Sequence, residues 1–117
     1  FQVMYQEGVV GGRFSLNRWI EMCSTAPAKM MGLYPQKGTI AVGSDADIVV
    51  YDPATSFVYG VDTIHGNIDY TAYDGLEVTG KVDTVLSRGR VIVENDGYSG
   101  TKGHGQYLKR GINQYLV

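Results

Sequence analysis

The sequence predicts an α+β chain in which helices come first, short antiparallel strands follow, and an extended tail ends the chain. Three observations carry this prediction. Apolar residues near the start recur every three or four positions, the spacing of one helix face. Short runs rich in β-branched residues, separated by turn residues, occupy the middle. The final segment is punctuated by glycine and has little apolar surface.

Residues 1–33 are predicted to be helical. The first apolar stripe consists of Leu16, Trp19, Ile20 and Cys23. Ser15 directly precedes this stripe, and its hydroxyl can accept an otherwise unpaired N–H, so we expect it to cap the helix. The glycine-rich segment Gly8–Gly12 lacks the Lys and Ser/Thr of a phosphate-binding loop and is interpreted as a flexible turn before the helix.

A second, short helix is expected to begin at Thr25. Thr25 can cap it, and Pro27 suits its first turn. Gly32 is placed to end it in a left-handed conformation. Its apolar residues are Ala28, Met30, Met31 and Leu33, which we interpret as core.

Strands are predicted after Tyr34. Lys37–Gly43 is expected to be extended between its glycines, and Asp47–Pro53 is interpreted as a buried strand ended by proline. The later strand runs are Leu76–Thr79, Thr84–Ser87 and Val91–Glu94. Gly89 supplies the positive φ of a tight hairpin between the last two, so a short antiparallel unit is predicted there.

The predicted sheet and tail lack a closed core of their own. Four or five short strands with two helices at one end leave strand edges and faces uncovered, and small sheets need paired strands or a covering helix. We therefore expect strands from elsewhere to complete the sheet. Gly97–Val117 is glycine-rich and only weakly helical at Gln106–Arg110, so it is expected to pack on the body or on a neighbouring subunit.

Composition narrows the function classes. The chain has 117 residues, 44% hydrophobic and 19% charged, with a formal net charge of −2 and dispersed basic residues, which argues against nucleic-acid or polybasic membrane binding. No apolar run approaches the ~20 residues that span a bilayer. Cys23 has no partner for an internal disulfide, which favours a reducing, cytoplasmic compartment. Phe1 begins neither a signal peptide nor an initiator-Met terminus, so we expect an internal segment.

The residues that could carry chemistry favour structural roles. His65 and His104 lie far apart in loop-like sequence, whereas a catalytic zinc site needs about three protein ligands. Asp45 and Asp47 could pass for an acid–base pair, but they sit in a Gly/Ser turn where Asp accepts local backbone N–H bonds. Cys23 falls on the apolar stripe and is interpreted as a buried hydrophobe. We predict no catalytic, cofactor-binding or metal-ligating residue in this chain.

Several segments resemble the cyclic amidohydrolases, specifically the dihydropyrimidinase and D-hydantoinase family. The most informative is Gly32–Val50, GLYPQKGTIAVGSDADIVV, whose pattern Gly-x-Ile-x-x-Gly-x-x-Ala-Asp-Ile-Val is similar to the passage from barrel to β-sandwich in amidohydrolases. The other matching segments are Gly12–Arg18, Ser24–Lys29, Asn67–Gly75, Glu77–Gly80 and Gly105–Arg110. The resemblance covers nearly the whole chain, as its C-terminal portion only.

The resemblance implies an α/β parent protein with a TIM-type barrel and a composite β-sandwich. It implies that 1–33 are terminal barrel helices, 34–95 the C-terminal half of the sandwich, and 96–117 a tail on the body or a neighbouring subunit. It implies hydrolysis of cyclic amides such as dihydropyrimidines and hydantoins at a C–N bond, as in pyrimidine degradation, by two zinc ions held outside this chain. It also implies a homotetramer.

Two alternatives stay open. Collapsin-response mediator proteins share this C-terminal architecture without the full metal-ligand set, so the parent could be a non-enzymatic, partner-binding relative. The chain could also be an independent β-rich interaction module, which would unfold cooperatively by itself. A severed half-domain would instead aggregate or remain molten, because its strand edges would be unpaired.

Overall fold

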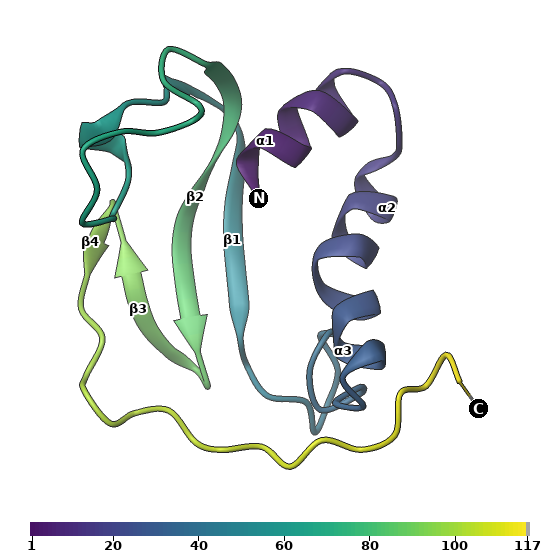
Figure 1. Cartoon of the computed structure of the whole chain (residues 1–117). Coiled ribbons are helices and arrows are strands. Elements are labelled where there is room, and N and C mark those ends of the chain that lie inside the picture. Colours follow the sequence, from purple (N-terminus) through teal and green to yellow (C-terminus); the bar gives the residue numbers. More distant parts are fainter. Residues whose placement is uncertain (117) are drawn as a thin grey trace.

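A computed structural model describes residues 1–116 as two helical segments, one four-stranded antiparallel sheet and an extended tail (Figure 1). The helical bounds are α1 Gln2–Met4, η1 Tyr5–Val10, α2 Leu16–Ile20, η2 Glu21–Thr25, α3 Ala26–Met30 and the short η3 Val61–Thr63. The strands are β1 Ile48–Val58, β2 Glu77–Ser87, β3 Arg90–Glu94 and β4 Gly97–Tyr98. The predicted α+β class is confirmed for these residues.

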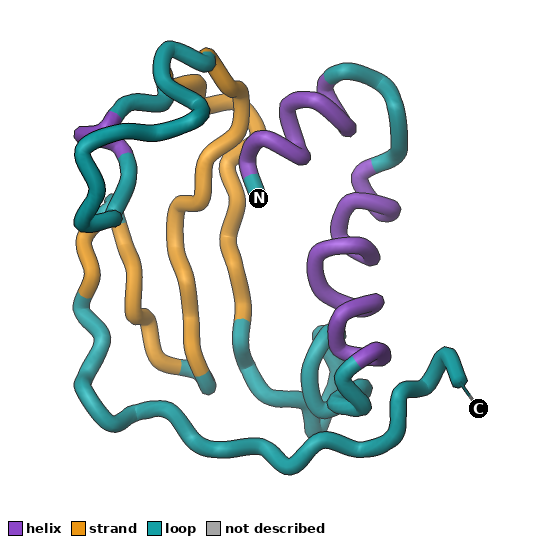
Figure 2. Tube along the Cα trace, in the orientation of Figure 1, coloured by secondary structure: helices purple, strands orange, loops and turns teal. Residues whose placement is uncertain are grey.

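The first helical segment begins earlier than expected. α1 and η1 join into one helix that contains Gly8, so the turn predicted over Gly8–Gly12 is wrong at its start (Figure 2). Gly8 is buried here because the Phe14 ring occupies the space of a side chain. The chain turns only at Gly11 and Gly12, where Gly12 has a φ of 71°.

The second segment confirms the cap at Ser15 but not the break at Thr25. The Ser15 hydroxyl accepts a hydrogen bond from the Arg18 N–H at 3.2 Å. Thr25 has helical dihedrals (φ −66°, ψ −45°), so α2, η2 and α3 form one helix, and the Thr25 hydroxyl donates to the Gly38 carbonyl at 2.7 Å instead. Gly32, with a φ of 64°, follows the end of this helix as predicted.

The connector between helix and sheet, residues 31–47, is built from turns. The extended stretch predicted at Lys37–Gly43 is wrong, because no strand forms there. Gly38 and Gly43 have φ values of 83° and 91°, in the left-handed region that glycine tolerates best, and they fold the connector back on itself. The connector therefore reaches β1 as a compact loop.

The sheet has the order β1-β2-β3-β4, with every neighbouring pair antiparallel. β1 is longer than predicted and continues past Pro53, which sits in the register shift between Asp52 and Ser56 where no ladder bond is required of it. The predicted runs at 76–79 and 84–87 merge into β2, because Gly80 adopts a φ of 97° within the strand.

The hairpin between β2 and β3 is confirmed. Arg88 and Gly89 both have positive φ (50° and 78°), the requirement of the tight turn that matches strand twist. A second turn, missed from the sequence, places Asn95 and Asp96 at φ values of 50° and 62° and returns the chain as the short strand β4. Asn and Asp are the non-glycine residues that tolerate this region best.

The helices meet the sheet through one aromatic cluster, formed by Phe1, Tyr5, Trp19 and Tyr51. The Tyr51 ring centroid lies 5.0 Å from that of Tyr5 and 5.1 Å from that of Trp19, and Phe1 lies 4.3 Å from Trp19. These separations are typical of tilted and edge-to-face aromatic pairs. Beside the cluster, the Thr79 N–H donates to Oε1 of Gln6 at 2.8 Å and ties the first helix to β2.

Little apolar surface is buried in this arrangement. The buried hydrophobic residues of the described chain are Tyr5, Trp19, Ala28 and Val78. By contrast, Val49, Val50 and Val91 on the strands are each more than 40% exposed. Such strand residues normally face a second layer. Their exposure here is consistent with the expectation that strands from elsewhere complete the sheet.

The tail runs from β4 along the end of the sheet to the end of helix α3 (Figure 1). The weak helix predicted at Gln106–Arg110 is wrong: the segment has no helical turn and Tyr107 is 90% exposed. Helix nucleation is unfavourable in a short segment unless an apolar face packs against the rest of the protein, and this segment has no such face. Val117 lies outside the described residues. The expected division at 33 and 95 stays a prediction, although β4 falls within the segment assigned to the tail.

The contact over Gly80 yields a stability prediction. A Cβ at Gly80 would overlap the Tyr51 hydroxyl and the Tyr5 ring, whereas one at Gly43 would meet nothing within 4 Å, although both have similar φ. Gly43→Ala should therefore cost only the left-handed strain of about 1 kcal/mol. Gly80→Ala should cost a further ~1–3 kcal/mol from overpacking.

Thermal unfolding of the complete natural chain that carries these residues measures the difference. The Gly80→Ala variant should melt at the lower temperature of the two. Equal melting temperatures would mean that the aromatic cluster does not close over Gly80.

Candidate functional site

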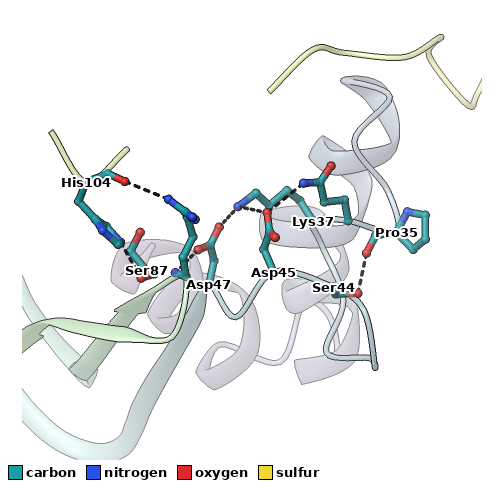
Figure 3. Close-up of polar contacts among 9 residues, drawn as sticks. Pro35, Lys37, Ser44, Asp45, Asp47, Ser87 and His104 are labelled. Atoms are coloured by element: carbon teal, nitrogen blue, oxygen red, sulfur yellow. Dashed lines mark hydrogen bonds and ion pairs between the residues drawn. The ribbon is translucent and has the colours of Figure 1, made fainter. Parts of the chain in front are cut away.

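Polar groups of the connector, the β2–β3 turn and the tail meet in one junction, formed by Lys37, Asp45, Asp47, Arg88 and His104 (Figure 3). Lys37 Nζ lies 2.8 Å from Oδ2 of Asp45 and forms a second ion pair with Asp47. The two carboxylates therefore share one ammonium group. They do not form the isolated acid pair that acid–base catalysis would require.

Asp47 also accepts the backbone N–H of Arg88 at 2.8 Å through Oδ1. The sequence predicted local backbone bonds for this carboxylate. The predicted local bond is wrong for Asp47: the backbone N–H that it accepts belongs to the β2–β3 turn, 41 residues along the chain. The Gly89 N–H donates to the Ala46 carbonyl at 2.9 Å beside it, so the connector and this turn are joined twice.

The ionisation of the junction favours structure over catalysis. Burial opposes the charge on Asp47, but hydrogen bonds from Lys37 and Arg88 and their positive charges outweigh it and hold the pKa of Asp47 below its ordinary value. Burial likewise opposes the charge on Lys37, yet the two aspartates raise the pKa of Lys37. Each shift moves a pKa away from neutrality, opposite to what a general acid or base needs.

The histidines do not converge on a metal. His104 is half-buried, and its Nε2 lies 3.0 Å from the Ser87 carbonyl, while its own carbonyl accepts from Arg88 Nη1 at 3.1 Å. His65 is exposed in the loop before β2. Within residues 1–116, no group of three His, Cys, Asp or Glu side chains could hold a metal ion. The side chains described here therefore do not fit a resident metal.

Cys23 is half-buried on the second helix. Burial raises the pKa of its thiol. A reactive cysteine needs a lowered pKa, because the thiolate is the nucleophile. Cys23 thus matches the structural interpretation of its position on the apolar stripe.

Two hollows of about 290 and 300 Å³ open on the sheet. The first is lined by Asp52, Thr55, Lys81, Val82, Asp83, Asn95 and Asp96. The second lies between the end of β2 and the start of the tail and includes Ser87, Tyr98 and His104. Ligand pockets of this size are usually lined mostly by apolar side chains with a few placed polar groups, and the polar lining of the first hollow differs from that pattern.

Sequence reasoning missed Lys37 and Arg88 as members of the junction. Lys37 gave no signal, because an ammonium reaches two aspartates only after the connector has folded back. Arg88 stands beside the predicted turn glycine, so its position was visible but its guanidinium contact was not. The expectation that this chain supplies no catalytic, cofactor-binding or metal residue stays a prediction. No helix of residues 1–116 has the length and apolar character to cross a membrane.

Comparison with known proteins gives one consistent family. The family model described as "Amidohydrolase family" matches residues 2–92. The D-hydantoinase of Streptomyces coelicolor is 52% identical over 114 residues, which cover 97% of this chain and 24% of that protein. The D-hydantoinase of Geobacillus stearothermophilus is 44% identical over 92% of this chain. The chain thus spans about a quarter of the length of the curated relatives it matches.

Solved structures agree with the sequence relatives. The D-hydantoinase from a Bacillus sp. AR9 superposes with a TM-score of 0.92 and 49% identity, covering 95% of this chain and 24% of that one. The dihydropyrimidinase from Brevibacillus agri NCHU1002 gives a TM-score of 0.90 and 48% identity over 93% of this chain and 24% of that one. The arrangement of helices, sheet and tail is therefore similar to one found within these larger chains.

The junction predicts a measurable shift at Asp47. Lys37→Met removes the hydrogen bond and charge that lower the pKa of this carboxyl, so its pKa should rise toward or above the ordinary value. Because the pKa is depressed in the folded state, the stabilisation is complete above the ordinary Asp range and is lost as pH falls through the folded-state pKa.

Carboxyl NMR titration of the complete chain measures this pKa. Lys81→Met is the matched control, since Lys81 pairs with Asp96 instead, and should leave the Asp47 titration unchanged. An unshifted Asp47 pKa in Lys37→Met would contradict the assignment.

Proposed function

The chain belongs to the amidohydrolase family, within its dihydropyrimidinase and hydantoinase group, and we propose that the complete protein opens cyclic amides such as dihydropyrimidines and hydantoins at a C–N bond. The observation that carries this proposal is the 52% identity to a D-hydantoinase over 97% of the chain. The TM-score of 0.92 to a D-hydantoinase structure agrees with it.

In this proposal residues 1–117 have a structural role and do not form the active site. Residues 1–33 support the end of the hydrolase barrel, and 34–95 form the C-terminal half of a composite β-sandwich. Residues 96–117 pack on the body or on a neighbouring subunit of a homotetramer. The exposed valines of β1 and β3 support the sandwich, since such strands normally face a second sheet across about 10 Å.

Amidohydrolases are generally metal-dependent, and we propose two zinc ions held by residues outside this chain. When bound, such metals lower the pKa of water and polarise the carbonyl of the substrate. The described residues do not fit them, so no catalytic step is assigned to these side chains. A reducing, cytoplasmic location is supported by the free Cys23. A role in pyrimidine degradation is supported by the similarity to a dihydropyrimidinase.

The activity is tested on the complete natural chain. It should hydrolyse dihydrouracil or hydantoin, and metal removal by a chelator should lower kcat by at least about a hundredfold, since a metal supplies several kcal/mol of transition-state stabilisation. Adding zinc should restore the rate. A complete chain that folds and tetramerises but opens neither ring, with or without metal, would favour the non-enzymatic, partner-binding alternative.

The structural role is tested on residues 1–117 alone. With few residues buried, this segment should unfold without cooperativity and bind a dye for exposed apolar surface. It should show no hydrolase activity. A cooperative, monomeric transition would favour an independent β-rich module, and stoichiometric zinc binding with ring opening by this segment would refute the proposed division of roles.

A further inference from the structure

Three segments distant in sequence meet at the β2–β3 turn. The connector contributes Asp47, whose Oδ1 accepts the Arg88 N–H at 2.8 Å. The turn contributes the Arg88 guanidinium, whose Nη1 donates to the His104 carbonyl at 3.1 Å. The tail contributes His104, whose ring Nε2 lies 3.0 Å from the Ser87 carbonyl. Figure 3 shows these contacts as one chain of polar groups from Lys37 to His104.

The tail has a second attachment at the end of helix α3. The Gly111 N–H donates to the Gly32 carbonyl at 3.0 Å, and the Gln114 N–H donates to the Lys29 carbonyl at 3.0 Å. The Gln114 side-chain amide also donates to the Tyr34 carbonyl at 2.9 Å. The acceptors lie in the last turn of α3 (Lys29), just beyond its end (Gly32) and in the connector (Tyr34).

Between its two attachments the tail is mostly exposed to solvent in this chain. Residues 105–110 are exposed apart from the half-buried Leu108, and Tyr107 is 90% exposed. Within the described residues, polar contacts at the two ends join the tail to the rest of the chain. The tail bridges the turn of the sheet and the end of the helix as a strap, defined here as residues 104–114.

Asp47 acts on the strap through Arg88. The φ of Arg88 is 50°, a conformation that a non-glycine residue adopts only when its surroundings hold it. The bond from its N–H to Asp47 supplies such a restraint, and the resulting turn directs the guanidinium to His104. Lys37 in turn fixes Asp47 in the connector.

We propose that Asp47 and Arg88 form a latch that fastens the tail strap to the β2–β3 turn, and that attachment of the strap at helix α3 depends on this latch. Asp47 is a positioning residue and Arg88 is the residue that holds the strap. The connector and the strap then form two parallel links between the helices and the sheet. This role is independent of the hydrolase activity proposed above.

The expected size of the coupling follows from chain entropy. With the latch closed, the free span is the five residues from 105 to 109, because Arg110 Nη1 lies 3.0 Å from the Met31 sulfur. Loss of the latch leaves the tail joined to the turn by the His104 ring, whose Nε2 lies 3.0 Å from the Ser87 carbonyl. Once that contact also opens, the nearest fixed point is the Ser99 N–H, bonded to the Ile92 carbonyl at 2.9 Å, and the free span roughly doubles. Doubling a flexible span weakens closure about threefold. The Gly111 and Gln114 amides should therefore exchange about threefold faster.

Hydrogen exchange of the complete natural chain tests the latch with Arg88→Asn. Asparagine tolerates positive φ and keeps the backbone N–H, so the turn survives while the guanidinium is lost. The Gly111 and Gln114 amides should exchange about threefold faster, while the paired residues Val85 and Val93 keep their protection. Arg90→Asn, the same change at an exposed arginine on β3, is the matched control and should leave the strap unaffected.

The role of Asp47 is tested by three further variants. Asp47→Ala removes the acceptor and should loosen the strap as Arg88→Asn does. Asp45→Ala removes the contacts of this carboxylate with Lys37 and Gln36 and should not loosen the strap. Asp47→Asn keeps an oxygen for the Arg88 N–H and should retain the protection that Asp47→Ala loses. Unchanged exchange at Gly111 and Gln114 in Arg88→Asn, or an equal rise in Arg90→Asn, would overturn the latch. Equal loss in Asp47→Asn and Asp47→Ala would overturn the role of Oδ1.

Discussion

The packing of Tyr5 and Trp19 on Tyr51, over the bare backbone of Gly80, is the contact on which the rest of the chain depends. It is the place where the helices bury side chains against the sheet. Each aromatic pair contributes ~0.5–1.5 kcal/mol beyond its buried area. The Lys37 ion pairs at the other link are partly exposed and therefore weaker, at most about 1 kcal/mol each. The aromatic contact sets the position of the helices, and the polar junction refines it.

That single contact covers only part of the sheet. The exposed remainder fits a chain that spans about a quarter of the length of its relatives. A sheet with one helix against it can fold alone only when its apolar face is covered. Here Val49, Val50 and Val91 stay more than 40% exposed while Val78, beneath the helices, is fully buried. The pattern of burial therefore follows the boundary of the helical layer. In the proposed sandwich, strands outside this chain cover the remaining strands.

The sequence predicted the features that depend on neighbouring residues and missed those that depend on distant ones. Ser15 caps its helix through a bond three residues away, and Gly32 and Gly89 take positive φ because their own backbones allow it. Thr25 has an equally good capping side chain, but its hydroxyl is bonded to the Gly38 carbonyl thirteen residues later. Asp47, in the connector, accepts the backbone N–H of Arg88 in the β2–β3 turn. Such pairings follow from the fold and leave no periodicity in the chain.

The junction also shows why charged residues in a conspicuous motif need not be catalytic. Asp45 and Asp47 stand in the most recognisable segment of the chain, yet both pair with the same ammonium, and the pKa of Asp47 is held low. A carboxylate in that state accepts hydrogen bonds well and exchanges protons poorly near neutral pH. The requirement it meets is geometric, because the chain must pass from helix to sheet in a fixed orientation. The junction meets that requirement with few residues, because its charged side chains join the connector, the β2–β3 turn and the tail.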